Sequence, residues 1–162
     1  MSDTREVTVR KAEKKDAPRL VELLHTMAEM HHEGRPDFFL SGSKYTVKDV
    51  EKKINSTDEI ILVAADENDF VTGYTMSKIY ERGGEGIMAR QKAMYIDDVC
   101  VDKEFRRSGI GKKLMNATVK EAEKAGCQIA ELNVWAFNEQ AIKFYKSCGL
   151  TKQRQYMEVV LK

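Results

Sequence analysis

The sequence has few of the features that mark membrane, secreted or multidomain proteins. Its 162 residues include only two prolines and three cysteines. No apolar stretch approaches the roughly 20 residues of a membrane-spanning helix, and residues 1–6 lack the apolar core of a signal peptide. An odd number of cysteines without metal-ligand spacing is typical of a reducing compartment. We therefore expect a soluble, cytoplasmic protein with a single domain over residues 1–162, no membrane partner and no metal site.

The chain also lacks an excess of either charge. Lysine and arginine together number 27 and aspartate and glutamate 26, so the formal net charge is +1. Binding to a nucleic acid usually requires a basic excess, and nucleic acid is therefore not an expected partner. An apolar fraction of 42% is sufficient for a folded core, which excludes a disordered chain.

Apolar periodicity predicts strands and helices that alternate along most of the chain. Strands are expected at residues 7–10, 60–65, 70–80, 93–101, 129–135 and 156–161. Helices are expected at residues 17–28, 46–54, 109–125 and 139–147, with an irregular connection over residues 30–44. Only residues 93–135 form an obvious strand–helix–strand crossover, so an α/β (α+β) protein with a mixed sheet is predicted.

The most informative segment lies between residues 99 and 113. A continuous apolar run, typical of a buried strand, is followed by a polar turn and by Gly109 and Gly111 at a helix start. Residues 103–113 contain five basic side chains and one acid, a local charge of +4. A helix start with free N–H groups and this charge is suited to a phosphate, although a glycine pair alone often marks only a tight turn. The spacing fits neither a Rossmann fingerprint nor a P-loop.

Two motifs in this half of the chain resemble a known family. Arg106-x-x-Gly109-x-Gly111 resembles the acetyl-CoA signature of the GNAT N-acetyltransferase superfamily, Gln/Arg-x-x-Gly-x-Gly/Ala. Residues 138–150 are similar to the later motif Asn-x-x-Ala-x-x-x-Tyr-x-x-x-Gly-Phe/Leu of the same superfamily. The resemblance covers residues 95–150. It implies the GNAT fold, a central mixed, mostly antiparallel twisted sheet of six to seven strands flanked by about four helices, and acetyl-CoA as the cofactor.

The resemblance also implies which residues hold the cofactor. Backbone groups of the central strand would pair with the pantetheine arm, provided that this strand diverges from its neighbour near Trp135. The N–H groups of the glycine loop would bind the diphosphate, and Tyr145 would return a proton to the departing CoA thiolate. The implied cofactor-binding residues are Val99, Cys100, Val101, Arg106, Arg107, Ser108, Gly109, Ile110, Gly111, Lys112, Asn138, Ala141, Phe144 and Tyr145.

The acceptor half of the site is less well specified. Residues 95–98, Tyr-Ile-Asp-Asp, are similar to the Tyr-Leu-Glu-Asp string of spermidine/spermine N-acetyltransferases, where the acidic pair serves a cationic acceptor. Asp97 matches the glutamate and is the first choice as the base, acting through a water; Asp98 is the alternative. Strand alternation predicts that the two side chains point to opposite faces, so that only one faces the acceptor. The connection after the first helix and the following strands offer further acceptor contacts, namely Arg35, Asp37, Phe38 and Trp135.

The resemblance implies an N-acetyltransferase that moves acetyl from acetyl-CoA to a primary amine of a small cationic acceptor, a polyamine or an amino-acid-like amine. The reaction would be a direct attack in a ternary complex, because no histidine is placed to activate Cys100 as a nucleophile. A protein or peptide N-acetyltransferase and a non-catalytic acyl-CoA sensor are the alternatives. A homodimer is common in the family, and the sequence neither requires nor excludes one.

Overall fold

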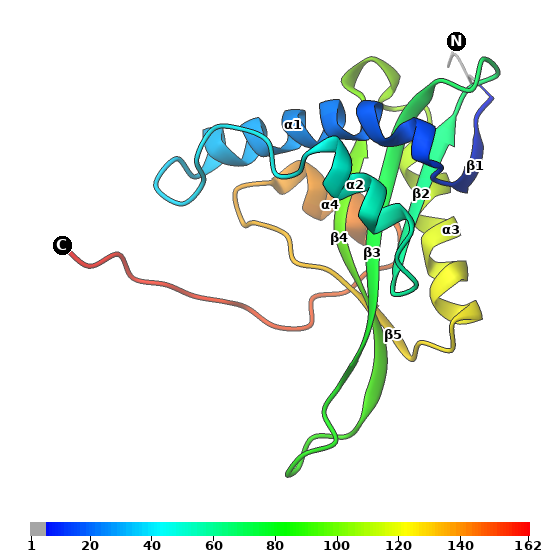
Figure 1. The fold of residues 1–162 in the computed structure, drawn as a ribbon. Helices are drawn as coiled ribbons and strands as arrows, with labels where there is room; N and C mark the ends of the chain where they lie inside the picture. The colour runs from blue at the N-terminus through cyan, green and yellow to red at the C-terminus, as the bar shows by residue number, and fades with distance from the viewer. Residues whose placement is uncertain (1–5) are drawn as a thin grey trace.

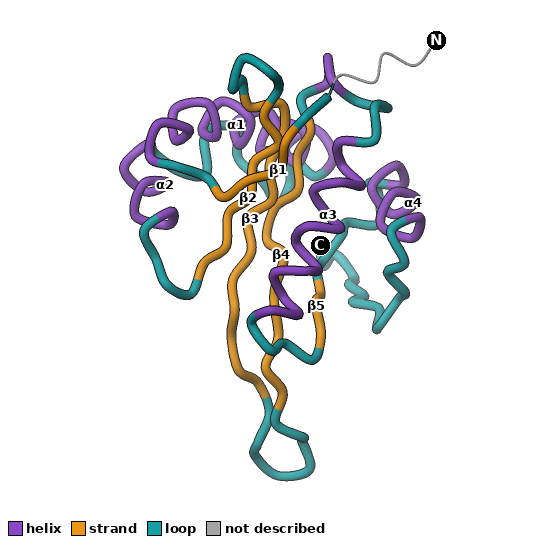
Figure 2. The backbone as a smooth tube through the Cα atoms, turned by 90° about the vertical axis from the view of Figure 1, so that its right-hand side faces the viewer, coloured by secondary structure: helices purple, strands orange, loops and turns teal. Residues whose placement is uncertain are grey.

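A computed structural model describes residues 6–162 and arranges them in three layers, with a twisted sheet between two pairs of helices (Figures 1 and 2). The sheet contains, in spatial order, β1 (Thr8–Lys11), β2 (Glu59–Ala65), β3 (Val71–Arg82), β4 (Gln91–Val101) and β5 (Ile129–Glu131). Neighbouring strands are antiparallel except β4 and β5, which are parallel. One face is covered by α1 (Ala17–Gly34) and α2 (Val47–Ile54), the other by α3 (Ile110–Lys124) and α4 (Glu139–Ser147). The predicted mixed, mostly antiparallel sheet with four helices is confirmed.

Each face of the sheet has its own apolar core. On one face, Leu20 and Leu24 of α1, spaced four residues apart, pack with buried Tyr74 and Met76 of β3. On the other face, Met115 of α3 packs with residues of β4, which also contact α4. The apolar side chains of the helices recur at helical spacing and therefore lie on one stripe, which the sheet covers. No helix among residues 6–162 is both long and apolar enough to cross a membrane.

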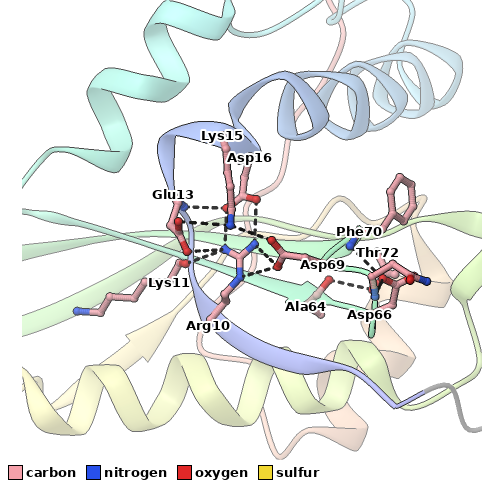
Figure 3. Close-up of polar contacts among 11 residues, drawn as sticks. Arg10, Lys11, Glu13, Lys15, Asp16, Ala64, Asp66, Asp69, Phe70 and Thr72 are labelled. Carbon is pink, nitrogen blue, oxygen red and sulfur yellow. Dashed lines mark hydrogen bonds and ion pairs between the residues drawn. The ribbon is translucent and has the colours of Figure 1, made fainter.

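Polar contacts tie the start of α1 to the hairpin between β2 and β3 (Figure 3). The Arg10 guanidinium donates to Asp16 at 2.7 Å and to Asp69 at 2.9 Å, and Asp69 lies in the turn of the hairpin. Asp16 occupies the N-cap position of α1, but its carboxylate accepts from Arg10 and from the Glu13 N–H and makes no cap bond to the helix. At the start of α2, Thr46 and Asp49 form a capping box.

Three element boundaries differ from the prediction. Helix α1 continues to Gly34, so that the histidines at its end are helical and the irregular connection begins only at Arg35. Strand β5 has three residues, because β4 and β5 diverge beyond it. The final strand predicted at residues 156–161 does not form, and the described residues hold five strands in place of the expected six to seven. A strand requires a neighbour for its backbone hydrogen bonds, and residues 156–161 have none.

Candidate active site

Strands β4 and β5 separate in the middle of the sheet. Their pairing ends at Tyr95 opposite Glu131, whereas β4 continues to Val101 with only β3 beside it. The divergence expected from the sequence is therefore present, four residues earlier than Trp135. Within the described chain, the edge of β4 from Ile96 to Val101 that faces away from β3 has no strand partner. An extended ligand can pair with such an edge as an added strand.

A β-bulge in β4 sets the direction of the acidic pair. The ladder with β3 pairs Met76 with Asp98 and Ser77 with Ile96, so Asp97 is an extra residue without a partner. Bulges bend a strand and redirect its side chains, and they are frequent beside active sites. Both carboxylates reach the same cation, since the Lys44 Nζ lies 2.8 Å from Asp97 Oδ2 and 3.1 Å from Asp98 Oδ2. The expectation that the two side chains point to opposite faces is wrong, because the bulge interrupts the alternation.

The two acids differ in burial and in proton affinity. The Asp98 side chain is 8% exposed and the Asp97 side chain 37%. Burial raises the pKa of Asp98 to about 6, against the opposing effect of the Lys44 ammonium and with a further increase from Asp97. Although burial lowers the pKa of Lys44, the carboxylates of Asp98 and Asp97 raise it above its usual value. Lys44 is therefore a permanent ammonium held by the pair. Sequence reasoning missed Lys44, which lies 53 residues before Asp97.

Two further side chains near Asp97 and Asp98 have raised pKa values and are protonated at neutral pH. Tyr145 of α4 is half-buried, and burial, followed by the charge of Asp98, raises its pKa to about 12. Burial likewise raises the pKa of the Cys100 thiol to about 11. Tyr145 is thus a neutral donor near pH 7, and Cys100 is a protonated thiol, unsuited to act as a nucleophile.

A buried tyrosine that the sequence did not single out lies beside Asp98. Tyr74 of β3 is fully buried opposite Cys100, and its hydroxyl has no hydrogen-bond partner among residues 6–162. Burial and then the Asp98 carboxylate raise the pKa of Tyr74 well above its usual value. A buried hydroxyl without a partner is rare and costs free energy, which often indicates a group reserved for a ligand or a water. Only the fold brings Tyr74 to Asp98, and no local pattern could have identified it.

The turn between β4 and α3 forms an anion cradle. Gly109 is the N-cap of α3 with φ of 81°, a left-handed conformation that favours glycine, and Arg107 has φ of 61°. Arg106 closes the turn by donating from Nε to the Val101 carbonyl at 3.0 Å. In the described part of the chain, the first backbone N–H to donate after this turn is that of Lys113, to the Gly109 carbonyl. The N–H groups of residues 107–112 therefore remain available, as expected for the first turn of a helix.

The later motif holds α4 against this cradle. The Asn138 carboxamide accepts from the Ala141 N–H at 3.1 Å and so caps α4. A Cβ on Gly111 would lie 3.0 Å from the ring of Phe144, so glycine at 111 permits the close approach of α3 and α4. Gly109 and Gly111 thus have different roles, the first in backbone conformation and the second in helix packing. Of the other cradle residues, Arg106, Arg107 and Lys112 have exposed side chains, Ser108 is half-exposed and Ile110 is buried.

The four residues predicted for the acceptor form one cluster. The Arg35 guanidinium stacks 5.4 Å above the ring centroid of Trp135, and the Phe38 ring is 5.0 Å from the same ring. Asp37 accepts from Arg35 at 2.8 Å. Arg35, Asp37 and Phe38 lie in the connection between α1 and α2, which also carries Lys44, whereas Trp135 lies between β5 and α4. No group of three or more His, Cys, Asp or Glu side chains within residues 6–162 is placed to hold a metal ion.

The sequence and fold match known proteins. The acetyltransferase (GNAT) family matches residues 25–150. An uncharacterised N-acetyltransferase of Methanocaldococcus jannaschii is 38% identical over 64 residues, which are 40% of this chain and 28% of that protein. L-ornithine N5-acetyltransferase of Arabidopsis thaliana is 37% identical over 59 residues, 36% of this chain and 26% of that protein. Thialysine N-epsilon-acetyltransferase of Sus scrofa is 34% identical over 56 residues, 35% of this chain and 33% of that protein.

The matched segments thus span about a quarter to a third of these curated relatives. Among solved structures, a mutant of the BH1408 protein of Bacillus halodurans has a TM-score of 0.92 at 28% identity, with 96% of this chain and 99% of that chain covered. An aminoglycoside acetyltransferase from an uncultured soil sample has a TM-score of 0.72 at 22% identity, with all of both chains covered, and shares the fold.

Proposed function

Because the chain belongs to the acetyltransferase (GNAT) family, we propose that it transfers acetyl from acetyl-CoA to a primary amine of a small cationic acceptor. The observation that carries this proposal is the Lys44 ammonium between Asp97 and Asp98. A pair of carboxylates that holds an alkylammonium of this chain can hold that of an acceptor.

The residues present fit acetyl-CoA, which supplies the activated acyl group. The free N–H groups of residues 107–112, with Arg106, Arg107 and Lys112 around them, suit the diphosphate. The open edge of β4 from Val99 to Val101 suits the amides of the pantetheine arm. The cradle and the edge adjoin along one segment of chain, so a single extended ligand can occupy both.

Two groups of this chain move protons in the proposed reaction. An acidic side chain takes a proton from the acceptor's ammonium, which frees the nitrogen lone pair for direct attack in a ternary complex. The Tyr145 hydroxyl, protonated at neutral pH, donates a proton to the departing sulfur as the C–S bond breaks, and the second proton lost by the attacking nitrogen restores the hydroxyl. A covalent intermediate on Cys100 is not part of the proposal, since that thiol is buried and protonated.

Asp98 is better suited than Asp97 to accept the proton. Its raised pKa of about 6 is closer to neutral pH, where a general base is most effective. The buried Tyr74 hydroxyl beside it supplies a second polar group for a bridging water, which needs two to four partners. Asp97, the first choice from the sequence, is more exposed and is proposed to bind the acceptor's ammonium.

Lys44 favours an amino-acid-like acceptor over a polyamine. Its ammonium has three N–H donors and uses two, one on the Oδ2 atom of each carboxylate. The Oδ1 atoms remain for the acceptor's ammonium, and the third Lys44 donor remains for an acceptor carboxylate. A polyamine carries no carboxylate and would meet repulsion from Lys44. Two relatives are named for the acetylation of ornithine and thialysine, which are diamino acids of the favoured kind.

The test is amine-dependent release of CoA thiol from acetyl-CoA, measured with ornithine, thialysine, spermidine and a peptide with a free N-terminus. We expect the diamino acids to give the highest kcat/KM. In Lys44→Met, the preference for diamino acids over spermidine should disappear. Acetyl-CoA binding without thiol release for any amine would support the sensor alternative, and release only with the peptide would support a protein N-acetyltransferase.

We also propose that residues 1–162 act as one domain in the cytoplasm. All five strands found within residues 6–162 belong to one sheet, and the free thiols of Cys100, Cys127 and Cys148 suit a reducing compartment.

A further inference from the structure

The Lys44 ammonium is held by the two acids that are proposed to serve the acceptor. Its Nζ atom is 2.8 Å from Asp97 Oδ2 and 3.1 Å from Asp98 Oδ2. A lysine side chain ends in a primary alkylammonium, the same group that the proposed acceptor presents. Asp98 is followed directly by Val99, where the open edge of β4 proposed for acetyl-CoA begins. The protein therefore carries a primary amine of its own next to the proposed position of the acetyl group.

The loop that carries Lys44 is fixed on α1. Ser41 donates from its hydroxyl to Glu29 Oε1 at 2.7 Å, and Gly42 donates its N–H to the same oxygen at 3.0 Å. These bonds hold the backbone just before Lys44 against the helix, so its side chain reaches β4 from a defined starting point. The Lys44 side chain is 41% exposed and has a long, flexible stem, so its nitrogen can move toward an acyl group while the loop stays in place.

Transfer of an acetyl group to Lys44 requires that its ammonium first lose a proton. Although burial lowers the pKa of Lys44, the carboxylates of Asp98 and Asp97 raise it above its usual value, so the free amine is rare at neutral pH. Asp98 contacts the ammonium and is the proposed base for the acceptor, so the same carboxylate can take this proton. Proximity offsets the rarity of the amine, because a nucleophile held beside the acyl group reacts in an effectively unimolecular step. We expect a slow reaction, which an acceptor placed between Lys44 and the thioester would block.

We propose that Lys44 is a self-acetylation site, which the protein modifies with its own acetyl-CoA when no amine acceptor is present. The site depends on the proposed function, because the acetyl donor and the groups that move protons are the same. Lys44 Nζ gives one proton to Asp98 and attacks the thioester carbonyl, so that an N–C bond forms and the C–S bond breaks. The Tyr145 hydroxyl gives its proton to the departing sulfur, and the second proton lost by Nζ restores it. The products are Nε-acetyl-Lys44, CoA thiol and a proton that Asp98 releases to water.

Acetylation would change what the site binds. It removes the positive charge of Lys44 and leaves a single N–H donor in place of three. The contacts with Asp97 and Asp98 would then weaken, and the donor proposed for an acceptor carboxylate would be lost. The repulsion of a polyamine would disappear as well. Self-acetylated protein should therefore lose its preference for diamino acids over spermidine.

The first test is mass spectrometry of the full chain after incubation with acetyl-CoA and no amine. The wild type should gain the mass of one acetyl group, and peptide mapping should place this group on Lys44. Lys44→Arg should gain none, because a guanidinium stays charged. Lys53→Arg is the matched control: Lys53 Nζ also lies 2.8 Å from a carboxylate, that of Glu59, and this variant should be modified like the wild type. Excess ornithine should suppress the modification. An equal gain in Lys44→Arg, or a gain that ornithine does not suppress, would overturn the proposal.

Rate measurements separate self-acetylation from other routes to the same product. Asp98→Asn and Tyr145→Phe should slow the acetylation of Lys44 roughly a hundredfold or more, whereas equal rates in all variants would indicate chemical acetylation and contradict the proposal. The first-order rate constant should not depend on protein concentration, and a proportional increase would show transfer between copies instead. Thiol release with ornithine is measured on the same preparation. Release with unmodified Lys44 would overturn self-acetylation alone, and the absence of both reactions would overturn the proposed function as well.

Discussion

Replacing Asp98 with asparagine should make the protein more stable and less active. The Asp98 side chain is 8% exposed, and burial, offset only in part by Lys44, raises its pKa to about 6. The pKa of an aspartate in an unfolded chain is about 3.9. The folded protein therefore binds the Asp98 proton more tightly than the unfolded chain does, and an ionised Asp98 opposes folding.

The size and sign of the effect follow from this difference. About two pH units, at about 1.36 kcal/mol each, give about 3 kcal/mol for ionising Asp98 in the folded state. This cost is absent below about pH 4, where the carboxyl is protonated in both states, and it is complete above about pH 6. Stability is therefore lost as the pH rises through this window. Asparagine resembles the neutral carboxyl, so Asp98→Asn should gain up to about 3 kcal/mol near pH 7, or about 6–12 °C in Tm.

The assay is thermal unfolding, followed by circular dichroism, at about pH 4 and about pH 7. Asp98→Asn should melt higher than the wild type near neutral pH, and this advantage should shrink toward pH 4. Asp97→Asn is the matched control, because it breaks an exposed ion pair to Lys44 worth about 0–1 kcal/mol. A Tm for Asp98→Asn that is lower than that of the wild type near pH 7 would refute the reasoning.

Activity measured on the same variants assigns the base. If Asp98 takes the proton, Asp98→Asn should lower kcat roughly a hundredfold to ten-thousandfold, while Asp97→Asn should mainly raise the KM for the amine. A substitution that raises stability and lowers turnover indicates that the original side chain serves catalysis at a cost in stability. A larger fall in kcat for Asp97→Asn would identify Asp97 as the base.

Three other substitutions test the cofactor half of the site. Tyr145→Phe should lower kcat roughly a hundredfold or more without changing Tm or acetyl-CoA affinity, and unchanged kcat would remove Tyr145 from the mechanism. Gly111→Ala places a methyl 3.0 Å from Phe144. Thermal unfolding should therefore show a loss of stability of about 1–3 kcal/mol, and calorimetric titration with acetyl-CoA a loss of binding free energy of about the same size. Arg107→Gly relieves a φ of 61° and keeps the backbone N–H; its stability should stay within about 1 kcal/mol of the wild type. A large loss of acetyl-CoA affinity in that variant would assign the diphosphate contact to the side chain.

Local sequence signals predicted most of the fold near the cradle. The apolar run in β4, the glycine at 109 and the helical periodicity of α3 each depend on residues close in sequence, and each element forms where expected. The capping box at Thr46 is equally local. The prediction of a last strand was wrong because strand formation is not a local property. Residues 156–161 have the pattern of a strand, but a strand also requires a neighbour, which the pattern does not contain.

Residue order was enough to identify the family and the cradle, because the residues that form the cradle follow one another within a single strand, turn and helix start. The acceptor-binding half of the site, in contrast, depends on contacts between residues far apart in the sequence. A bulge at Asp97 turns both acids toward Lys44, and the sheet buries Tyr74 beside Asp98. These groups come from separate elements, and the burial that raises the pKa of Asp98 arises only in the folded sheet, where the connection between α1 and α2 brings Lys44 against it. Proton affinity depends on that enclosure and on nearby charge, and neither quantity can be read from residue order.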